Sequence, residues 1–292
     1  MTQGVPMNVE TDSCPRKAAR SALLVSAVRS DRVEKALAGR ADMVIVDLGS
    51  PVPTADRQAS REALARVLHE HPGTPLAVRV SPPDTPEHDE DLLFCQRFEA
   101  ISTVVVPGID SIASLVSVAA LGRPIWPLID SAAGLGALRE IASADGVERL
   151  GFGAQELALD LDMAVGTSGG ESLLDQARFA LIMQSRLAGL LAPLAEVSPI
   201  IGDSEALRAT ARRALDMGFG GMLCSHPAQP GPINEAFTPS SAQLDWARRV
   251  LADADTIDFM VDGEPISASL IHRAKRLVAR SGSVRKTSPS SP

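Results

Sequence analysis

Short apolar stretches alternate along the chain with longer stretches whose apolar residues recur every three to four positions. The short stretches are almost continuously apolar, which is typical of parallel strands buried on both faces. The longer stretches have the period of amphipathic helices that pack against such a sheet. This pattern predicts βα units, with strands over residues 21–28, 42–48, 75–81, 102–108, 124–130, 148–153, 194–200 and 221–227.

Eight strands is the number that closes a parallel barrel. The competing architecture, an open doubly wound sheet, carries a GxGxxG fingerprint after its first strand, and here that strand is followed by RSDR. We therefore expect an α/β protein of the (β/α)8, or TIM barrel, class over residues 18–237. Two later amphipathic stretches predict a C-terminal helical extension over 238–281. Residues 1–17 and 282–292 are polar and aperiodic, and we expect them to be disordered tails.

Two of the predicted helices have recognisable ends. Ser30 and Ser204 stand where an N-cap side chain is expected, just before a periodic apolar stretch. Gly39 and Gly218 follow those stretches, where a helix commonly stops in a left-handed conformation. Helices of this length suit the outer ring of a barrel.

Composition narrows the classes of function. The 36 acidic and 28 basic residues give a formal net charge of −8, which argues against a broad nucleic-acid-binding surface. Cys14, Cys95 and Cys224 are far apart and form no CxxC, which favours a reducing compartment over a disulfide framework or a zinc site. No apolar run reaches the roughly 18 residues of a membrane span. The sequence thus predicts a soluble cytoplasmic protein without a membrane partner.

Polar residues at strand ends are the first candidates for a site, because (β/α)8 barrels build their active sites at the carboxyl ends of the strands. Asp47, Arg79 and Asp130 end the second, third and fifth predicted strands. Glu156 lies just after the sixth strand, and His226 ends the eighth.

Asp130 and Glu156 suggest a metal site, since two carboxylates from neighbouring strand ends can converge on a cation that prefers oxygen ligands, such as magnesium. The alternative is structural. Asp130 would then cap a helix beginning near Gly134, and Glu156 would lie in the first turn of the next helix, where the helix dipole favours a negative charge.

Arg79 lies in an otherwise apolar run, where a permanent positive charge needs a partner. It either pairs with Asp47 as a structural bridge or grips a substrate carboxylate or thioester oxygen, and one arginine can do both. For His226 a role in holding its own loop is favoured over acid, base or ligand chemistry. Cys224 is expected to point into packed core.

Several blocks resemble, in the same order, the citrate lyase beta subunit group of the HpcH/HpaI aldolase family. They are VDLGSPV, VRVSPP, VPGIDS, PLIDSAAG, FGAQELALDLD and MVDGEPISAS, and the likeness runs from about Arg20 to Arg280. The resemblance implies a TIM barrel that forms homotrimers or homohexamers. It also implies cleavage or formation of carbon–carbon bonds in acyl thioesters, with magnesium, or manganese as the alternative ion.

The resemblance also implies roles for individual residues. Arg79 matches the family's third-strand arginine, which with the metal stabilises an enolate. Asp130 and Glu156 match its two metal ligands, which here have exchanged lengths, because the family has Glu in the first block and Asp in the second. Asp47 is retained beside them as a further catalytic candidate. Arg20 near the first strand is the candidate for contacts with a substrate such as coenzyme A.

Four positions depart from the family pattern. Gly49 and Ser50 replace a Glu and an Asp, Gly108 replaces a Lys, and Ser267 replaces an Asp that reaches a neighbouring subunit's site as acid or base. A serine does not titrate near neutral pH. The expected function is a magnesium-dependent lyase or aldolase acting on a malyl, citramalyl or citryl thioester or a small 2-oxo acid. The alternatives are an impaired barrel that binds a ligand or partner subunit, and an acyl-CoA thioesterase.

Overall fold

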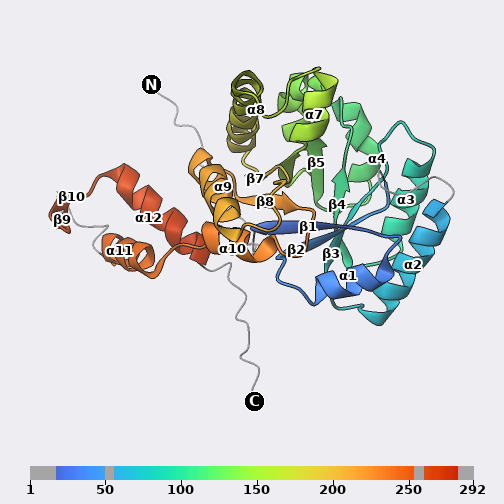
Figure 1. Cartoon of the computed structure of the whole chain (residues 1–292), viewed down its shortest axis with the longest axis horizontal. Helices are drawn as coiled ribbons and strands as arrows, with labels where there is room; N and C mark the ends of the chain where they lie inside the picture. The colour runs from blue at the N-terminus through green and yellow to red at the C-terminus, as the bar shows by residue number, and fades with distance from the viewer. Residues whose placement is uncertain (1–17, 50–55, 253–259, 282–292) are drawn as a thin grey trace, which may run out of the picture.

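The computed structural model describes residues 18–49, 56–252 and 260–281. Its eight parallel strands form a closed barrel in which each strand pairs with the next and β8 pairs with β1 (Figure 1). This confirms the predicted (β/α)8 fold. The strands are β1 (Ser21–Ser26), β2 (Met43–Asp47), β3 (Leu76–Arg79), β4 (Ile101–Val106), β5 (Ile125–Ile129), β6 (Arg149–Phe152), β7 (Leu191–Ala195) and β8 (Gly221–Cys224).

Strand β7 differs most from the sequence prediction. It begins at Leu191, whereas the predicted run covers residues 194–200 and overlaps the strand only at Leu194 and Ala195. The reason is local, because the strand sequence LAPLA contains alanine and proline, which are poor signals for a strand. The other seven predicted runs begin within one residue of the observed strands.

Side chains alternate between the barrel interior and the surrounding helices. Ile45, Ala77 and Val105 pack together inside the barrel with residues such as Trp126 and Leu128. Their strand neighbours pack in a second, larger cluster between the strands and the helices. Because the period of a strand is two residues, the positions two beyond Ile45, Ala77 and Leu128 also belong to the interior side. Those positions, at the carboxyl ends of their strands, are the candidate site residues of the sequence.

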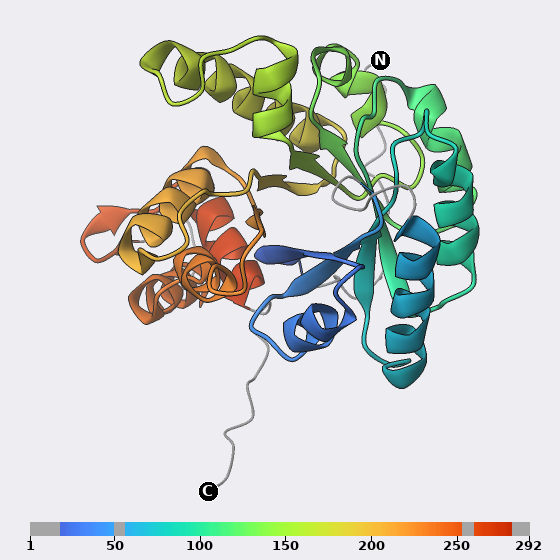
Figure 2. The same cartoon turned by 45° about the vertical axis from the view of Figure 1, so that its right-hand side comes forward.

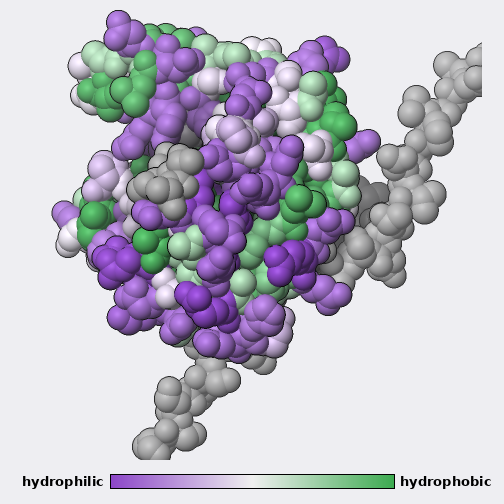
Figure 3. All heavy atoms as spheres, turned by 90° about the vertical axis from the view of Figure 1, so that its right-hand side faces the viewer, coloured by the Kyte–Doolittle hydropathy of each residue, from purple (hydrophilic) through white to green (hydrophobic). Residues whose placement is uncertain are grey.

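Helices surround the barrel on its outside (Figure 2). Over α2 and α3 the outer surface is largely hydrophilic, with hydrophobic residues in separate small patches (Figure 3). The helical elements are α1 (Ser30–Leu37), α2 (Arg57–Glu70), α3 (Glu87–Gln96), η2 (Ile112–Leu115), α4 (Val116–Ala119), α5 (Ala132–Gly136), α6 (Leu138–Ala142), α7 (Ala154–Asp160), α8 (Ser168–Leu187), α9 (Ser204–Met217) and α10 (Pro230–Phe237).

The helix ends match the sequence only in part. Ser30 is the first residue of α1 and makes no side-chain cap. Helix α9 is capped by Asp203 instead of Ser204, because the Asp203 carboxylate accepts hydrogen bonds from the backbone N–H groups of Glu205 and Ala206, each at 3.0 Å. Gly218 ends α9 with φ of 114°, as expected for a left-handed stop.

A small helical unit follows the barrel and extends to one side of it (Figure 1). It contains α11 (Ser241–Ala252), the short strands β9 (Met260–Val261) and β10 (Glu264–Pro265), and α12 (Ala268–Ser281). Helices α11 and α12 pack against each other around an apolar cluster of their own. None of the described helices combines the length and apolar character needed to cross a membrane. The predicted tails, Cys14 and Ser50 lie outside the described residues.

Candidate active site

Asp47 and Arg79 face each other across neighbouring strands at the rim of the barrel. Their Cα atoms are register partners of β2 and β3, and Arg79 Nη2 donates to Asp47 Oδ2. Asp47 is only 3% exposed, and its Oδ1 accepts a 2.9 Å hydrogen bond from Gly49 N. Arg79 Nε is buried and has no hydrogen-bond partner among the described residues. The structural bridge is therefore present, and it leaves donor capacity on the guanidinium for a further acceptor.

Asp130 and Glu156 converge on Gly153. A Cβ placed on Gly153 would lie 2.5 Å from Asp130 Cβ and 3.3 Å from Glu156 Oε2. Gly153 is the residue after β6 and the N-cap of α7, and the absence of a side chain there leaves room for Asp130 Cβ and the Glu156 carboxylate to approach the same point. Glu156 lies in the first turn of α7, as the structural alternative proposed. Asp130 caps no helix, since Ser131 caps α5 and accepts from Gly134 N at 3.0 Å.

The carboxylate of Asp130 is electrostatically unfavourable in the ionised state. Burial raises its pKa to about 6, and the negative charges of Glu156 and Asp110 act in the same direction. The backbone N–H of Gly108, 3.2 and 3.1 Å from the two oxygens, offsets only part of this. A site with two close carboxylates and too little positive charge suits a divalent cation.

The described residues offer a small set of ligands for a cation. Among the described residues no group of three or more His, Cys, Asp or Glu side chains is placed to hold a metal ion. The pair of Asp130 and Glu156 is the kind of ligand set that magnesium takes from a protein, because magnesium binds through one or two carboxylates and keeps water or substrate oxygens in its remaining positions.

Arg20 does not lie with these residues. It precedes β1, at the opposite end of the barrel, where its Nε and Nη2 donate to the carboxylate of Asp42 at 2.7 and 3.0 Å. Its Nη1 donates to Thr238 Oγ1 at 2.6 Å. The assignment of Arg20 to the substrate rests on the resemblance alone, because Arg20 precedes β1 and therefore lies at the amino end of that strand, away from the carboxyl ends that build the site. We do not retain it as a substrate-binding candidate.

His226 and Cys224 have structural surroundings. His226 Nδ1 accepts a 3.2 Å hydrogen bond from Ala228 N, so the ring holds its own loop. The loop is also held by Gln229, whose Oε1 accepts from His226 N at 3.1 Å. Cys224 is buried, and burial raises the pKa of its thiol to about 12. Sequence reasoning missed Gln229, a fully buried amide with no distinguishing motif.

Two of the positions that depart from the family pattern, Gly49 and Gly108, have local explanations, whereas nothing in the structure explains Ser267. Gly49 lies against the chain after β3, because a Cβ there would be 3.2 Å from Val80 O. Gly108 has φ of +63°, a conformation in which a lysine would be strained. Ser267 precedes α12, and its Oγ accepts a long, 3.4 Å hydrogen bond from Leu270 N.

Replacing Gly153 with alanine tests the convergence of the two carboxylates. The new Cβ would overlap Asp130 Cβ, so we expect Asp130 to be displaced and magnesium affinity to fall by about 10-fold or more. Calorimetric titration with MgCl2 measures the change. Gly169→Ala in α8 is the control, since a Cβ there meets nothing within 4 Å. Equal magnesium affinity in both variants would contradict the proposed convergence.

Comparison with known proteins gives a consistent set of relatives. Residues 20–227 match the sequence profile described as HpcH/HpaI aldolase/citrate lyase. A citrate lyase subunit beta-like protein of Mycobacterium tuberculosis is 31% identical over 270 residues, which cover 89% of this chain and 94% of the relative. A (3S)-malyl-CoA thioesterase of Cereibacter sphaeroides is 28% identical, covering 91% and 95%.

A solved structure agrees with the fold as well. The crystal structure of protein CitE from Mycobacterium tuberculosis, in complex with magnesium, acetoacetate and coenzyme A, has a TM-score of 0.76 at 30% sequence identity. The match covers 91% of this chain and 100% of that chain. The likeness therefore includes both the barrel and much of the C-terminal unit.

Proposed function

This chain belongs to the HpcH/HpaI aldolase/citrate lyase family, and from that premise we propose that it is a magnesium-dependent carbon–carbon lyase. Its substrate would be a carboxylated acyl-CoA thioester of the malyl, citramalyl or citryl type, or a small 2-oxo acid. The observation that carries the proposal is the convergence of Asp130 and Glu156 over Gly153, at the same end of the barrel as the Arg79–Asp47 pair.

The proposal assigns a role to each of four side chains. Asp130 and Glu156 would hold magnesium, which when bound supplies a Lewis acid for the carbonyl oxygen of the substrate. Arg79 would bind a carboxylate or thioester oxygen and neutralise the charge that develops as the carbon–carbon bond breaks and its electron pair forms an enolate. Asp47 orients the Arg79 guanidinium through their ion pair.

Removal of the metal tests this proposal. The purified full chain would be given malyl-CoA, citramalyl-CoA and citryl-CoA in turn, and oxaloacetate together with acetyl-CoA for the reverse reaction, with magnesium or with EDTA. We expect cleavage of a thioester to a shorter acyl-CoA and a 2-oxo acid, or condensation of acetyl-CoA with the oxo acid, only with magnesium, and chromatography of the products measures it. Turnover that is unaffected by EDTA would contradict the proposal, and absence of turnover on every substrate would favour an impaired, ligand-binding barrel.

A thioesterase is the second candidate, and one observation in its favour is the relative named (3S)-malyl-CoA thioesterase. The other is Ser267, which replaces the family's acid or base Asp and does not titrate near neutral pH. Hydrolysis releases free coenzyme A thiol, whereas carbon–carbon cleavage of malyl-CoA leaves the thioester intact. Titration of free thiol in the same reactions therefore separates the two activities. Thiol release without formation of a 2-oxo acid would select the thioesterase.

A further inference from the structure

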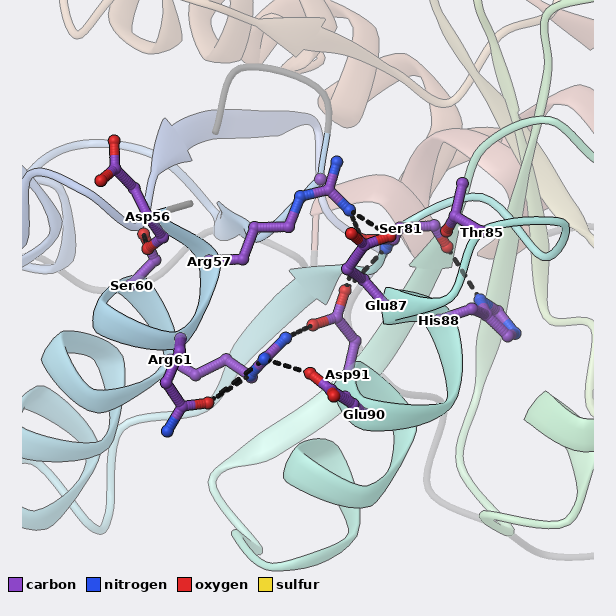
Figure 4. A network of polar contacts seen from close by, with 12 residues as sticks. Asp56, Arg57, Ser60, Arg61, Ser81, Thr85, Glu87, His88, Glu90 and Asp91 are labelled. Carbon is purple, nitrogen blue, oxygen red and sulfur yellow. Dashed lines mark hydrogen bonds and ion pairs between the residues drawn. The ribbon is translucent and has the colours of Figure 1, made fainter. Parts of the chain in front are cut away.

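Ser81, two residues beyond Arg79, has every polar group engaged by side chains of the outer helices (Figure 4). Its N–H and its Oγ both donate to Asp91 Oδ2, at 2.9 and 2.7 Å. Its carbonyl oxygen accepts from His88 Nδ1 at 2.8 Å. Arg57 Nη1 donates to its Oγ at 2.9 Å. The chain after β3 is therefore held by α3 through Asp91 and His88, and by α2 through Arg57.

Asp91 is the centre of this network. It is 0% exposed, and its second oxygen, Oδ1, accepts from Arg61 Nη1 at 2.9 Å. Arg57 in turn pairs with Glu87 at 3.1 Å, which links α2 to α3 a second time. A carboxylate this deeply buried is costly unless it is fully hydrogen-bonded, and the surrounding strand-to-helix packing is otherwise apolar. A polar cluster at this position therefore needs an explanation beyond packing.

The segment that Asp91 holds lies between the two charged centres of the candidate site. Ser81 Cα is 3.4 Å from the position of a Cβ on Gly49, whose N–H binds Asp47. Pro82 Cβ is 3.4 Å from the position of a Cβ on Gly108, whose N–H binds Asp130. A shift of the segment would thus move the backbone donors of both carboxylates.

We propose that Asp91 is a positioning residue that sets the Arg79–Asp47 pair and Asp130 relative to each other through the Ser81–Pro82 segment, an inference that rests on the proposed function. Asp91 touches neither substrate nor metal. It acts through Ser81, whose backbone position is fixed by the Asp91 carboxylate and the His88 ring. Residues that hold metal ligands or substrate-binding residues in place affect affinity and turnover, although they contact neither the metal nor the substrate.

Asp91→Asn and Ser81→Ala test the proposal. Asparagine keeps the size of the side chain but loses the charge that faces Arg61 and Ser81, whereas Ser81→Ala removes only one hydroxyl. The matched control is Asp42→Asn at the opposite end of the barrel, because Asp42 also accepts a backbone N–H, from Arg20 at 2.9 Å, and an arginine side chain. Thermal unfolding of each variant gives the loss of stability, to which the functional changes are compared.

The functional readout is calorimetric titration with magnesium and then with oxaloacetate. We expect Asp91→Asn to weaken both by about 10-fold or more, and Ser81→Ala to weaken them less, whereas Asp42→Asn leaves them within about 2-fold. If Asp91→Asn does not fold, Ser81→Ala alone decides the outcome. Equal affinities in the Asp42 and Asp91 variants would overturn the positioning role.

Amide hydrogen exchange separates a failure of this inference from a failure of the proposed function. If the wild-type protein binds neither magnesium nor oxaloacetate, the proposed function is refuted. The amide hydrogen exchange rates would then be the only test of the positioning role of Asp91. We expect Asp91→Asn to speed exchange at Gly49, Ser81 and Gly108 and to leave the amino ends of the strands protected. Exchange that rises throughout the barrel, or at none of these amides, would overturn the inference.

Discussion

Replacing Arg79 with lysine should lower kcat/KM for the cleaved substrate by about 100- to 1000-fold, the usual cost of losing one donor that stabilises a developing oxyanion. Lysine keeps the positive charge, so the loss would come from geometry. The guanidinium bridges Asp47 through one nitrogen and has others to offer, whereas a single ammonium on a flexible stem cannot hold Asp47 and orient a planar carboxylate at once.

Steady-state kinetics on the substrate that wild type turns over measures the Arg79 effect. The matched control is Arg123→Lys, because Arg123 is a half-buried arginine just before β5, at the far end of the barrel, where it donates to the backbone oxygens of Phe98 and Ile101. We expect its effect on kcat/KM to stay within about 3-fold. A similar loss of kcat/KM in both variants would mean that Arg79 acts only through the stability of the protein. Equal magnesium affinity in wild type and Arg79→Lys would show that the defect lies in a step after metal binding.

The barrel could be predicted from the sequence because its signals are local and repeated. Each buried strand forms its own apolar run, and the alternation that sends Ile45 and Ala77 into the interior also sends Asp47 and Arg79 to the inner rim. The same rule places Asp130 beside Gly153, where Glu156 meets it. Most residues of the candidate site could therefore be predicted from their positions at the ends of strands.

The supporting network could not be predicted in the same way. Residues 87–91 read as an acid-rich helix start, which normally faces solvent, yet His88 and Asp91 are buried. A signal was present, because both residues are in helical phase with the buried Leu92 and Cys95. Polar residues in phase with an apolar face are ambiguous, however, until the partner on another element is known, and here the partner is the backbone of Ser81.

Arg20 shows the limit of assigning a role by resemblance. The predicted strand begins at Ser21, as β1 does, so the sequence itself already places Arg20 at the amino end of that strand. Arg79 is the last residue of β3 and lies at the opposite end of the barrel. Its resemblance-based assignment to the substrate therefore gives way to its ion pair with Asp42.

Asp130→Asn should abolish measurable magnesium binding and, in the absence of metal, make the protein more stable at neutral pH. Burial raises the Asp130 pKa from 3.8 to about 6, so between those values the folded state binds more protons than the unfolded chain. Folding stability then falls as the pH rises through this window, by about 1–3 kcal/mol if one pKa unit corresponds to about 1.4 kcal/mol and the partial exposure of the group is allowed for. Asparagine carries no such charge.

Thermal unfolding with and without magnesium at pH 7.5 and near pH 4 separates these effects. At pH 7.5 without metal the variant should unfold at a higher temperature than wild type, and near pH 4 the difference should vanish because the wild-type carboxyl is also neutral there. Magnesium should raise the unfolding temperature of wild type only, and progressively less as the pH falls below about 6, because the proton and the cation compete for the same oxygens. The control is Asp216→Asn, on the exposed side of α9. It should give the same unfolding temperatures as wild type at both pH values, with and without magnesium. A variant that is less stable than wild type at pH 7.5, or that still gains stability from magnesium, would show that Asp130 is held as a structural hydrogen-bond acceptor for Gly108 and not as a metal ligand.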